Sequence, residues 1–160
     1  MTPSSSAGAR EVDGHDDEIA DTLADLYRLT FFESAATPQF DQGHWWLAYQ
    51  DRLAIAFAGM APSTRALNAG YFCRVGVMDR HRGPALQLRL MRATECRARR
   101  KGCCCIVSDT TNNLISANNF IRAGYRLYNH NIHGVGPIRC TGIPSRADEV
   151  LLGHTSLANF

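Results

Sequence analysis

The chain has few of the features that mark membrane-spanning, exported or nucleic-acid-binding proteins. Its 160 residues contain no apolar run near the ~20 residues that span a bilayer. The first six residues, Met1–Ser6, have neither the basic segment nor the apolar segment of a secretory signal, so we expect a cytoplasmic protein. The formal net charge of +2 is too small to indicate a nucleic-acid partner by itself.

Metal-ligand spacing is also missing, although the chain has six cysteines. Neither a Cys-x-x-Cys pair nor a mixed Cys/His pattern occurs, so we expect no metal site. Three cysteines are consecutive, Cys103–Cys105, in a stretch that predicts a strand. Neighbours in a strand point to opposite faces and are poorly placed to form a disulfide. We expect the cysteines to be reduced and buried as small apolar side chains.

The composition, 45% hydrophobic and 20% charged, fits one globular domain. Residues 1–14 are small, polar and unpatterned, and predict a flexible tail without a clear first strand. From His15 to about Phe32, apolar residues recur at helical spacing. Trp45–Tyr49 and Leu53–Met60 predict two strands joined by a polar turn.

The most informative stretch runs from Tyr71 to Tyr125. A strand at Tyr71–Met78 leads into a basic turn at Asp79–Pro84 and an Arg-rich helix from Ala85 to about Lys101. A second strand at Cys103–Ser108 and a short helix closed by Gly124 and Tyr125 follow. This order predicts two parallel strands flanking a crossover helix. A helix N-terminus exposes unpaired N–H groups and about half a positive charge, so this one could hold a phosphate.

The Arg-rich helix has a two-sided pattern. Its apolar side carries Leu86, Leu90, Met91, Ala93, Thr94 and Ala98, and its polar side carries Arg89, Arg92, Glu95 and Arg99. The arginines fit either a nucleic-acid surface or a solvated helix face, and we favour the solvated face. Gly102 is expected to end the helix in the left-handed conformation.

Two motifs in this stretch resemble the signatures of the GNAT superfamily of N-acetyltransferases. The turn Arg82-Gly83-Pro84-Ala85-Leu86-Gln87 resembles the family's pyrophosphate loop, Arg/Gln-x-x-Gly-x-Gly/Ala. The second motif is an Asn, a small residue, an aromatic and then Gly-Tyr: Asn113, Ser116, Phe120, Gly124 and Tyr125. Both motifs occur in order, separated by a helix and a strand of suitable length. The resemblance covers roughly Gly43 to Tyr128.

The resemblance implies an α/β fold with a central mixed sheet and a crossover helix between two splayed parallel strands. Residues 15–128 would form the acetyltransferase domain, and residues 129–160 an atypical segment that completes or caps the sheet. The family would have two antiparallel strands in this segment, whereas only Glu149–Leu152 reads as a strand. An incomplete sheet would leave an exposed edge, so a homodimer is one expectation.

Acetyl-CoA is the co-substrate that the resemblance implies. Its pantetheine arm would lie against Val75, Gly76 and Val77, and Gly76 would let the ligand approach the backbone without a Cβ in the way. The remaining implied contacts are Arg80, Arg82, Gly83, Ala85 and Leu86 at the diphosphate, and Asn113, Ser116 and Phe120 near the pantetheine or under the cofactor. Pro84 has no N–H, so we expect one backbone donor fewer than usual.

The implied activity is acetyl transfer to a primary amine of a small molecule or peptide, by direct attack without a covalent enzyme intermediate. The family often has tyrosine at the position of Phe120, where the phenol protonates the departing thiolate. Phenylalanine cannot do so, and Ser116, Tyr125 and Tyr128 are the candidate catalytic residues, with water as an alternative. The other function we consider is a non-catalytic acyl-CoA-binding or interaction module, which Pro84, Ala85, Phe120 and the atypical C-terminal segment favour. We expect neither a membrane nor a nucleic-acid partner.

Overall fold

The structure is a computed structural model that describes residues 8–31, 36–63, 68–108, 114–129 and 135–140. The chain divides into two compact units, the first within residues 1–60 and 74–94 and the second within residues 61–73 and 95–160. Strand β4 (Ala69–Val77) and helix α2 (Pro84–Arg100) each contribute residues to both units. The units are described separately below.

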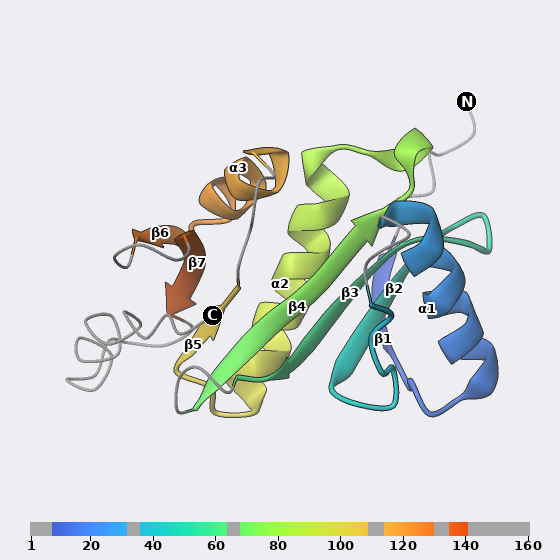
Figure 1. Cartoon of the computed structure of the whole chain (residues 1–160), viewed down its shortest axis with the longest axis horizontal. Coiled ribbons are helices and arrows are strands. Elements are labelled where there is room, and N and C mark those ends of the chain that lie inside the picture. The colour runs from blue at the N-terminus through green and yellow to red at the C-terminus, as the bar shows by residue number, and fades with distance from the viewer. Residues whose placement is uncertain (1–7, 32–35, 64–67, 109–113, 130–134, 141–160) are drawn as a thin grey trace. The chain divides into compact units, whose positions relative to one another are not determined.

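Three antiparallel strands begin the first unit: β1 (Gly8–Val12), β2 (His44–Gln50) and β3 (Leu53–Pro62) (Figure 1). The hairpin between β2 and β3 was expected, and its turn residues Asp51 and Arg52 both have positive φ, as a tight hairpin turn requires. Strand β1 was not expected. It pairs with β2 from Gly8↔Tyr49 to Val12↔Trp45, so residues 8–12 are not a tail.

Helix α1 (Asp17–Thr30) confirms the helical periodicity read after His15. The side chain of Asp16 caps it by accepting hydrogen bonds from the backbone N–H groups of Glu18 and Ile19. Its buried side is Leu23, Leu26 and Tyr27. The Tyr27 and Phe57 ring centroids lie 6.3 Å apart, so this side packs on β3.

Helix α2 follows β4 through the short 3₁₀ helix η1 (Asp79–His81) and ends, as expected, before Gly102 at φ 77°. Its expected apolar side is largely buried, including Leu90, Met91 and Ala98. The prediction that Glu95 lies on the exposed arginine side is wrong, because only 4% of this residue is exposed. The periodicity of charged residues gave no sign of a buried carboxyl group in this helix.

In the second unit, β4 and β5 (Cys105–Val107) pair in parallel from Ala69↔Cys105 to Tyr71↔Val107. The predicted mixed sheet with a crossover helix is therefore confirmed. The strand order continues β4-β5-β7-β6, with β7 (Val135–Cys140) antiparallel to both β5 and β6 (Arg126–Asn129). Helix α3 (Leu114–Arg122) precedes β6 and is followed by Gly124 at φ 88°.

Strands β6 and β7 correct the expectation for the C-terminal segment. Arg126–Asn129 and Val135–Cys140 pair as antiparallel strands, although Gly136 and Pro137 lie in the second of them. The expected strand Glu149–Leu152 lies outside the described residues. The described part of the chain has no helix both long and apolar enough to cross a membrane.

Candidate functional site

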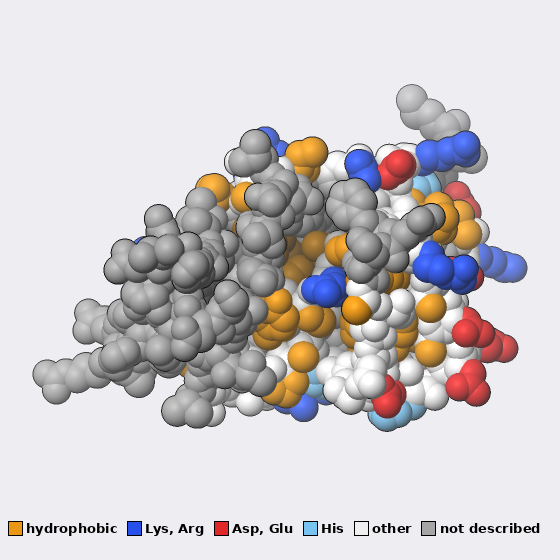
Figure 2. Space-filling model, viewed as in Figure 1, with side chains coloured by type: hydrophobic (Ala, Val, Ile, Leu, Met, Phe, Trp, Pro, Cys, Tyr) orange, Lys and Arg blue, Asp and Glu red, His pale blue; other side chains and the backbone are white. Residues whose placement is uncertain are grey.

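The turn between β4 and α2 is exposed and rich in arginine. The Met78 N–H donates to the Ile55 carbonyl oxygen at 2.9 Å, which ties the end of β4 to β3 before the chain turns. Arg80 and Arg82 are both exposed, and Arg82 Nη2 lies 2.7 Å from Asp79 Oδ1. Figure 2 shows basic side chains and an acidic one over this turn, at the top of the view. An exposed pair of this kind contributes little to stability, so Arg82 can exchange Asp79 for another anion at low cost.

The start of α2 differs from the start of α1. Helix α1 has the side chain of Asp16 on its N–H groups and acidic residues in its first turn, whereas α2 has no acidic residue in its first turn. Gly83, which precedes Pro84, has no side chain that could cap the helix. The unpaired N–H groups and the partial positive charge expected at the start of a 17-residue helix would favour an anion here.

Space for that anion exists at Gly83. A Cβ built on Gly83 would have no atom within 4 Å, and its φ lies outside the left-handed region. Ala85 is exposed and also has a negative φ, so it takes its place in the helix without strain. Leu86 is 8% exposed, so it could offer a ligand its backbone N–H rather than its side chain. These residues fit a diphosphate group, with Pro84 contributing no N–H.

At the end of β4, the structure gives Gly76 a different role from the one expected from the sequence. Gly76 is buried, and a Cβ on it would come closer than 3.0 Å to the Phe57 ring and to Thr30 Oγ1. Packing against α1 and β3 therefore requires glycine at this position, which the sequence attributed to the approach of a ligand. Val75 and Val77 are half-buried. Alternation along a strand puts their side chains on the face opposite the direction of the Gly76 Cβ.

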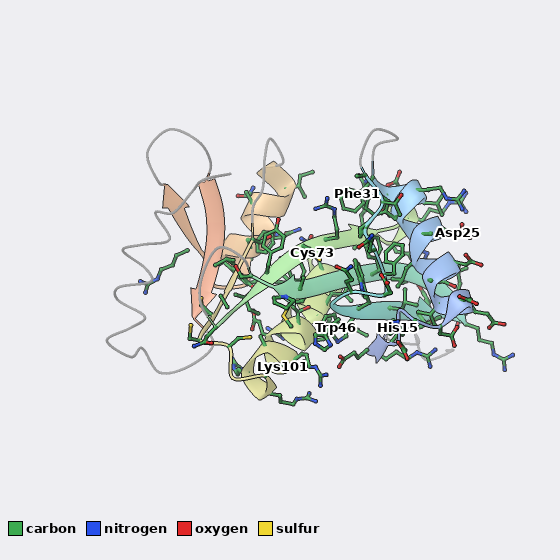
Figure 3. The ribbon with its side chains drawn as sticks, turned by 60° about the horizontal axis from the view of Figure 1, so that its bottom comes forward. His15, Asp25, Phe31, Trp46, Cys73 and Lys101 are labelled. Atoms are coloured by element: carbon green, nitrogen blue, oxygen red, sulfur yellow. The ribbon has the colours of Figure 1, made fainter. Side chains whose placement is uncertain are left out.

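A second feature beside Gly76 was not found from the sequence. The guanidinium carbon of Arg74 lies 5.9 Å from the centroid of the Phe31 ring. Phe31 follows the C-terminal end of α1 and is labelled in Figure 3. Phe31 in turn stacks on Tyr27 with ring centroids 4.7 Å apart. Arg74 and Phe31 are 43 positions apart in the sequence, and no local pattern pairs them.

In the second unit, the ladder between β4 and β5 is short. The paired residues end at Tyr71↔Val107. At the next position the Ser108 hydroxyl donates to the Phe72 carbonyl oxygen at 2.8 Å, so a side chain takes the place of a backbone donor. Strand β4 continues to Val77 without a further described partner from β5. A ladder that stops at Tyr71 while β4 runs on to Val77 is the pattern expected of two parallel strands that separate.

The second motif contributes to the core around α3. Phe120 is 1% exposed and lies edge-on to both Phe72 and Tyr125, with centroids 5.7 and 5.0 Å away. Tyr125 is 3% exposed. Asn113 and the side chains of Ser116 and Tyr128 lie outside the described part of the chain. Tyr125 is thus a buried residue of this cluster, and the catalytic roles of Ser116, Tyr125 and Tyr128 remain predictions.

The described residues do not form a recognisable metal-binding site. The described residues include no group of three or more His, Cys, Asp or Glu side chains that could hold a metal ion. None of the five cysteines with described side chains is in a disulfide.

Comparison with known proteins identifies the family. A model of the acetyltransferase (GNAT) family matches residues 15–125. The chain belongs to this family. The match contains both the turn before α2 and the second motif up to Tyr125, so the resemblance read from those residues is confirmed. A search of curated protein sequences finds no significant match.

Solved structures with the same fold support this membership. Aminoglycoside 6'-acetyltransferase type Ii aligns with a TM-score of 0.70 at 18% identity, over 86% of this chain and 98% of that one. The ribosomal-protein-S18-alanine N-acetyltransferase from Escherichia coli aligns with 0.67 at 8%, over 88% and 97%. N-acetylglutamate synthase from Neisseria gonorrhoeae, solved with coenzyme A and N-acetyl-glutamate, aligns with 0.64 at 12%, over 84% and 35%. At these identities, the similarity of the GNAT protein to these three structures shows a shared fold.

Proposed function

We propose that this GNAT acyltransferase moves the acetyl group of acetyl-CoA to a primary amine. The observation that carries the proposal is the start of α2, which has no acidic residue in its first turn and lies beside exposed Arg80 and Arg82. Acetyl-CoA supplies the thioester when bound. Its diphosphate would meet the N–H groups of Ala85 and Leu86 and the two guanidinium groups.

The chain's own part in the reaction is mainly positioning. Val75, Gly76 and Val77 would hold the pantetheine arm as a neighbouring strand, with a backbone N–H near Val77 polarising the thioester carbonyl. The amine nitrogen attacks that carbonyl carbon, the carbon–sulfur bond breaks, and the proton lost by nitrogen goes to the thiolate. Ser116, Tyr125, Tyr128 or water would deliver this proton. A thiol with a pKa of about 8.5 leaves without strong acid assistance.

The acceptor is an amine of a small molecule or a peptide. The names of the structural relatives include an aminoglycoside, the alanine of a ribosomal protein and acetylglutamate. These relatives support an amine acceptor as a class, without selecting one. A homodimer, the cytoplasm as location and the domain limits at residues 15–128 are further parts of this proposal.

Two measurements test the proposal together. Calorimetric titration with acetyl-CoA measures binding, and thiol release with a panel of primary amines measures turnover, with the acetylated product identified by its mass. We expect saturable binding and release that depends on the amine. Binding with no release for any amine would favour a non-catalytic acyl-CoA-binding module on the same fold. The absence of binding would remove both functions.

A further inference from the structure

One arginine lies on an otherwise apolar side of strand β4. Alternation along the strand puts Phe72, Arg74 and Gly76 on the same side. Phe72 is 2% exposed and Gly76 is buried, whereas Arg74 between them is half-buried. Partial burial of a charged side chain costs free energy that an exposed position does not. An arginine at this position therefore indicates a role that needs its charge or its N–H donors.

The C-terminal end of α1 covers this side of β4. Thr30 Oγ1 would lie closer than 3.0 Å to a Cβ on Gly76, and the ring of the next residue, Phe31, lies beside Arg74. Figure 1 shows this end of α1 next to the arrowhead of β4. Helix α1 and the part of β4 from Arg74 onward both belong to the first unit. The guanidinium group and the aromatic ring therefore meet within one compact unit.

This end of β4 also leads into the turn that would hold the diphosphate. Arg74 precedes Val77 by three residues, which is about 10 Å along a strand with a rise of about 3.3 Å per residue. In the proposed reaction, Val75–Val77 hold the pantetheine arm and the thioester carbonyl lies near Val77. An amine that attacks this carbonyl from the side of α1 would have Arg74 and Phe31 beside it.

We propose that Arg74 binds a carboxylate group of the acceptor, so that the acceptors are amines with a carboxylate close to the nitrogen, as in amino acids. This inference rests on the proposed acetyl transfer. A contact with an aromatic ring uses one face of the guanidinium plane, whereas the N–H donors point outward within that plane. The same group can therefore lie over Phe31 and donate two parallel hydrogen bonds to a carboxylate. Partial burial of Arg74 strengthens this attraction, because less water screens it.

A second arginine shows that the contact with a ring does not by itself explain the position of Arg74. The guanidinium carbon of Arg10 lies 4.6 Å from the centroid of the Tyr49 ring, closer than Arg74 lies to Phe31. Arg10 is nevertheless exposed. Such a contact forms at the surface without burying the charge. Partial burial distinguishes Arg74 from Arg10, and Arg10 provides a matched control.

The test compares common L-amino acids with the amines that lack their carboxylate, for example L-phenylalanine with phenethylamine and L-leucine with isoamylamine. Thiol release from acetyl-CoA gives kcat and KM for both members of each pair. We expect amino acids to be preferred over their counterparts by at least about tenfold in kcat/KM, the value of a hydrogen-bonded charge pair. In Arg74→Gln this preference should disappear, mainly through a higher KM. The amines without a carboxylate should react as fast as with the parent protein.

Two further variants serve as controls. Arg74→Lys keeps the positive charge but not the paired donors, so it should keep only part of the preference. Arg10→Gln removes a ring contact of the same kind and should leave the preference unchanged. Circular dichroism checks the fold of each variant, and Arg74→Lys takes the place of Arg74→Gln if the latter does not fold. Calorimetric titration of Arg74→Gln with acetyl-CoA should give the affinity of the parent protein.

Several outcomes would overturn the inference. One is the absence of any preference for amino acids in the parent protein, a result that needs no variant. Another is an equal preference in the parent protein and Arg74→Gln. Equal losses for both members of a pair would indicate a purely structural role, and a lower affinity for acetyl-CoA would assign Arg74 to the co-substrate.

A separate measurement distinguishes failure of this inference from failure of the proposed function. If no amine releases thiol, acetyl transfer to amines is refuted. The amino acids are then titrated by calorimetry into protein saturated with coenzyme A. Binding that is lost in Arg74→Gln and retained in Arg10→Gln would still support a carboxylate site at Arg74. The absence of binding in the parent protein would refute this site as well.

Discussion

Replacing Gly76 by alanine separates a packing role from a ligand role for this glycine. The added methyl group would come closer than 3.0 Å to the Phe57 ring and to Thr30 Oγ1. Phe57 is 0% exposed and has no room to withdraw, and Thr30 Oγ1 donates to the Leu26 carbonyl oxygen at 2.7 Å. The neighbours must therefore shift or the strand must move.

The expected size of the effect follows from two opposing contributions. Overpacking of a closed core costs about 1–3 kcal/mol. Alanine restricts the unfolded chain more than glycine and returns about 0.4–1 kcal/mol, because φ at this position is not in the left-handed region. A net loss of about 1–2 kcal/mol remains, which corresponds to a fall in Tm of roughly 2–8 °C for a chain of this size.

Urea and thermal unfolding of Gly76→Ala and of Gly8→Ala measure the effect. Gly8 is the matched control, because a Cβ there would meet nothing within 4 Å. We expect Gly8→Ala to keep the stability of the parent protein. Adding Phe57→Leu to Gly76→Ala should cost less than the sum of the two single changes, since the smaller side chain relieves the contact. If Gly76→Ala were as stable as Gly8→Ala and lost affinity for acetyl-CoA instead, the packing explanation would be refuted.

Three further predictions concern other parts of the chain. Asp16→Ala removes the cap of α1 and should lower the free energy of unfolding by about 1 kcal/mol in urea titrations, while Asp16→Asn should retain most of it. Phe120→Tyr puts a hydroxyl group into a fully buried ring cluster and should lower Tm rather than speed up acetyl transfer; a faster variant of unchanged Tm would contradict the burial. Burial, with a smaller contribution from Cys104, raises the pKa of the Cys103 thiol, so less thiolate is present at a given pH. Peptide mapping at mildly alkaline pH should therefore find slower alkylation of Cys103 than of exposed Cys96, and equal rates would contradict this.

The sequence predicted those elements whose signals are local. Helical spacing after His15, the hairpin around Asp51 and the crossover helix ending before Gly102 each depend on neighbouring residues, and each was found. The turn before α2 was also predictable, because a glycine, a proline and two arginines stand together in it. The edge strand β1 was missed because its order comes from pairing with β2, more than thirty residues away.

Contacts between distant segments explain the other misses. Val135–Cys140 contains Gly136 and Pro137, which argue against a strand, yet it pairs with β5 and β6. Glu95 follows the period of an exposed face but is buried. Gly76 was assigned to the ligand because no local pattern reveals the contact of Phe57 with that position. Cys104 was assigned to a strand, although the strand begins one residue later.

The most direct test of an acetyl-CoA site at the start of α2 is calorimetric titration of acetyl-CoA into Gly83→Asp. A carboxylate at this position can cap the helix, so the free energy of unfolding should stay the same or rise by about a few tenths of a kcal/mol. The same carboxylate should repel the diphosphate, since like charges about 4 Å apart near a surface interact by up to about 4 kcal/mol before screening. We predict a loss of affinity of more than about tenfold for Gly83→Asp, and a much smaller loss for the uncharged Gly83→Asn. Equal affinity in the parent protein and Gly83→Asp would contradict a diphosphate site in this turn.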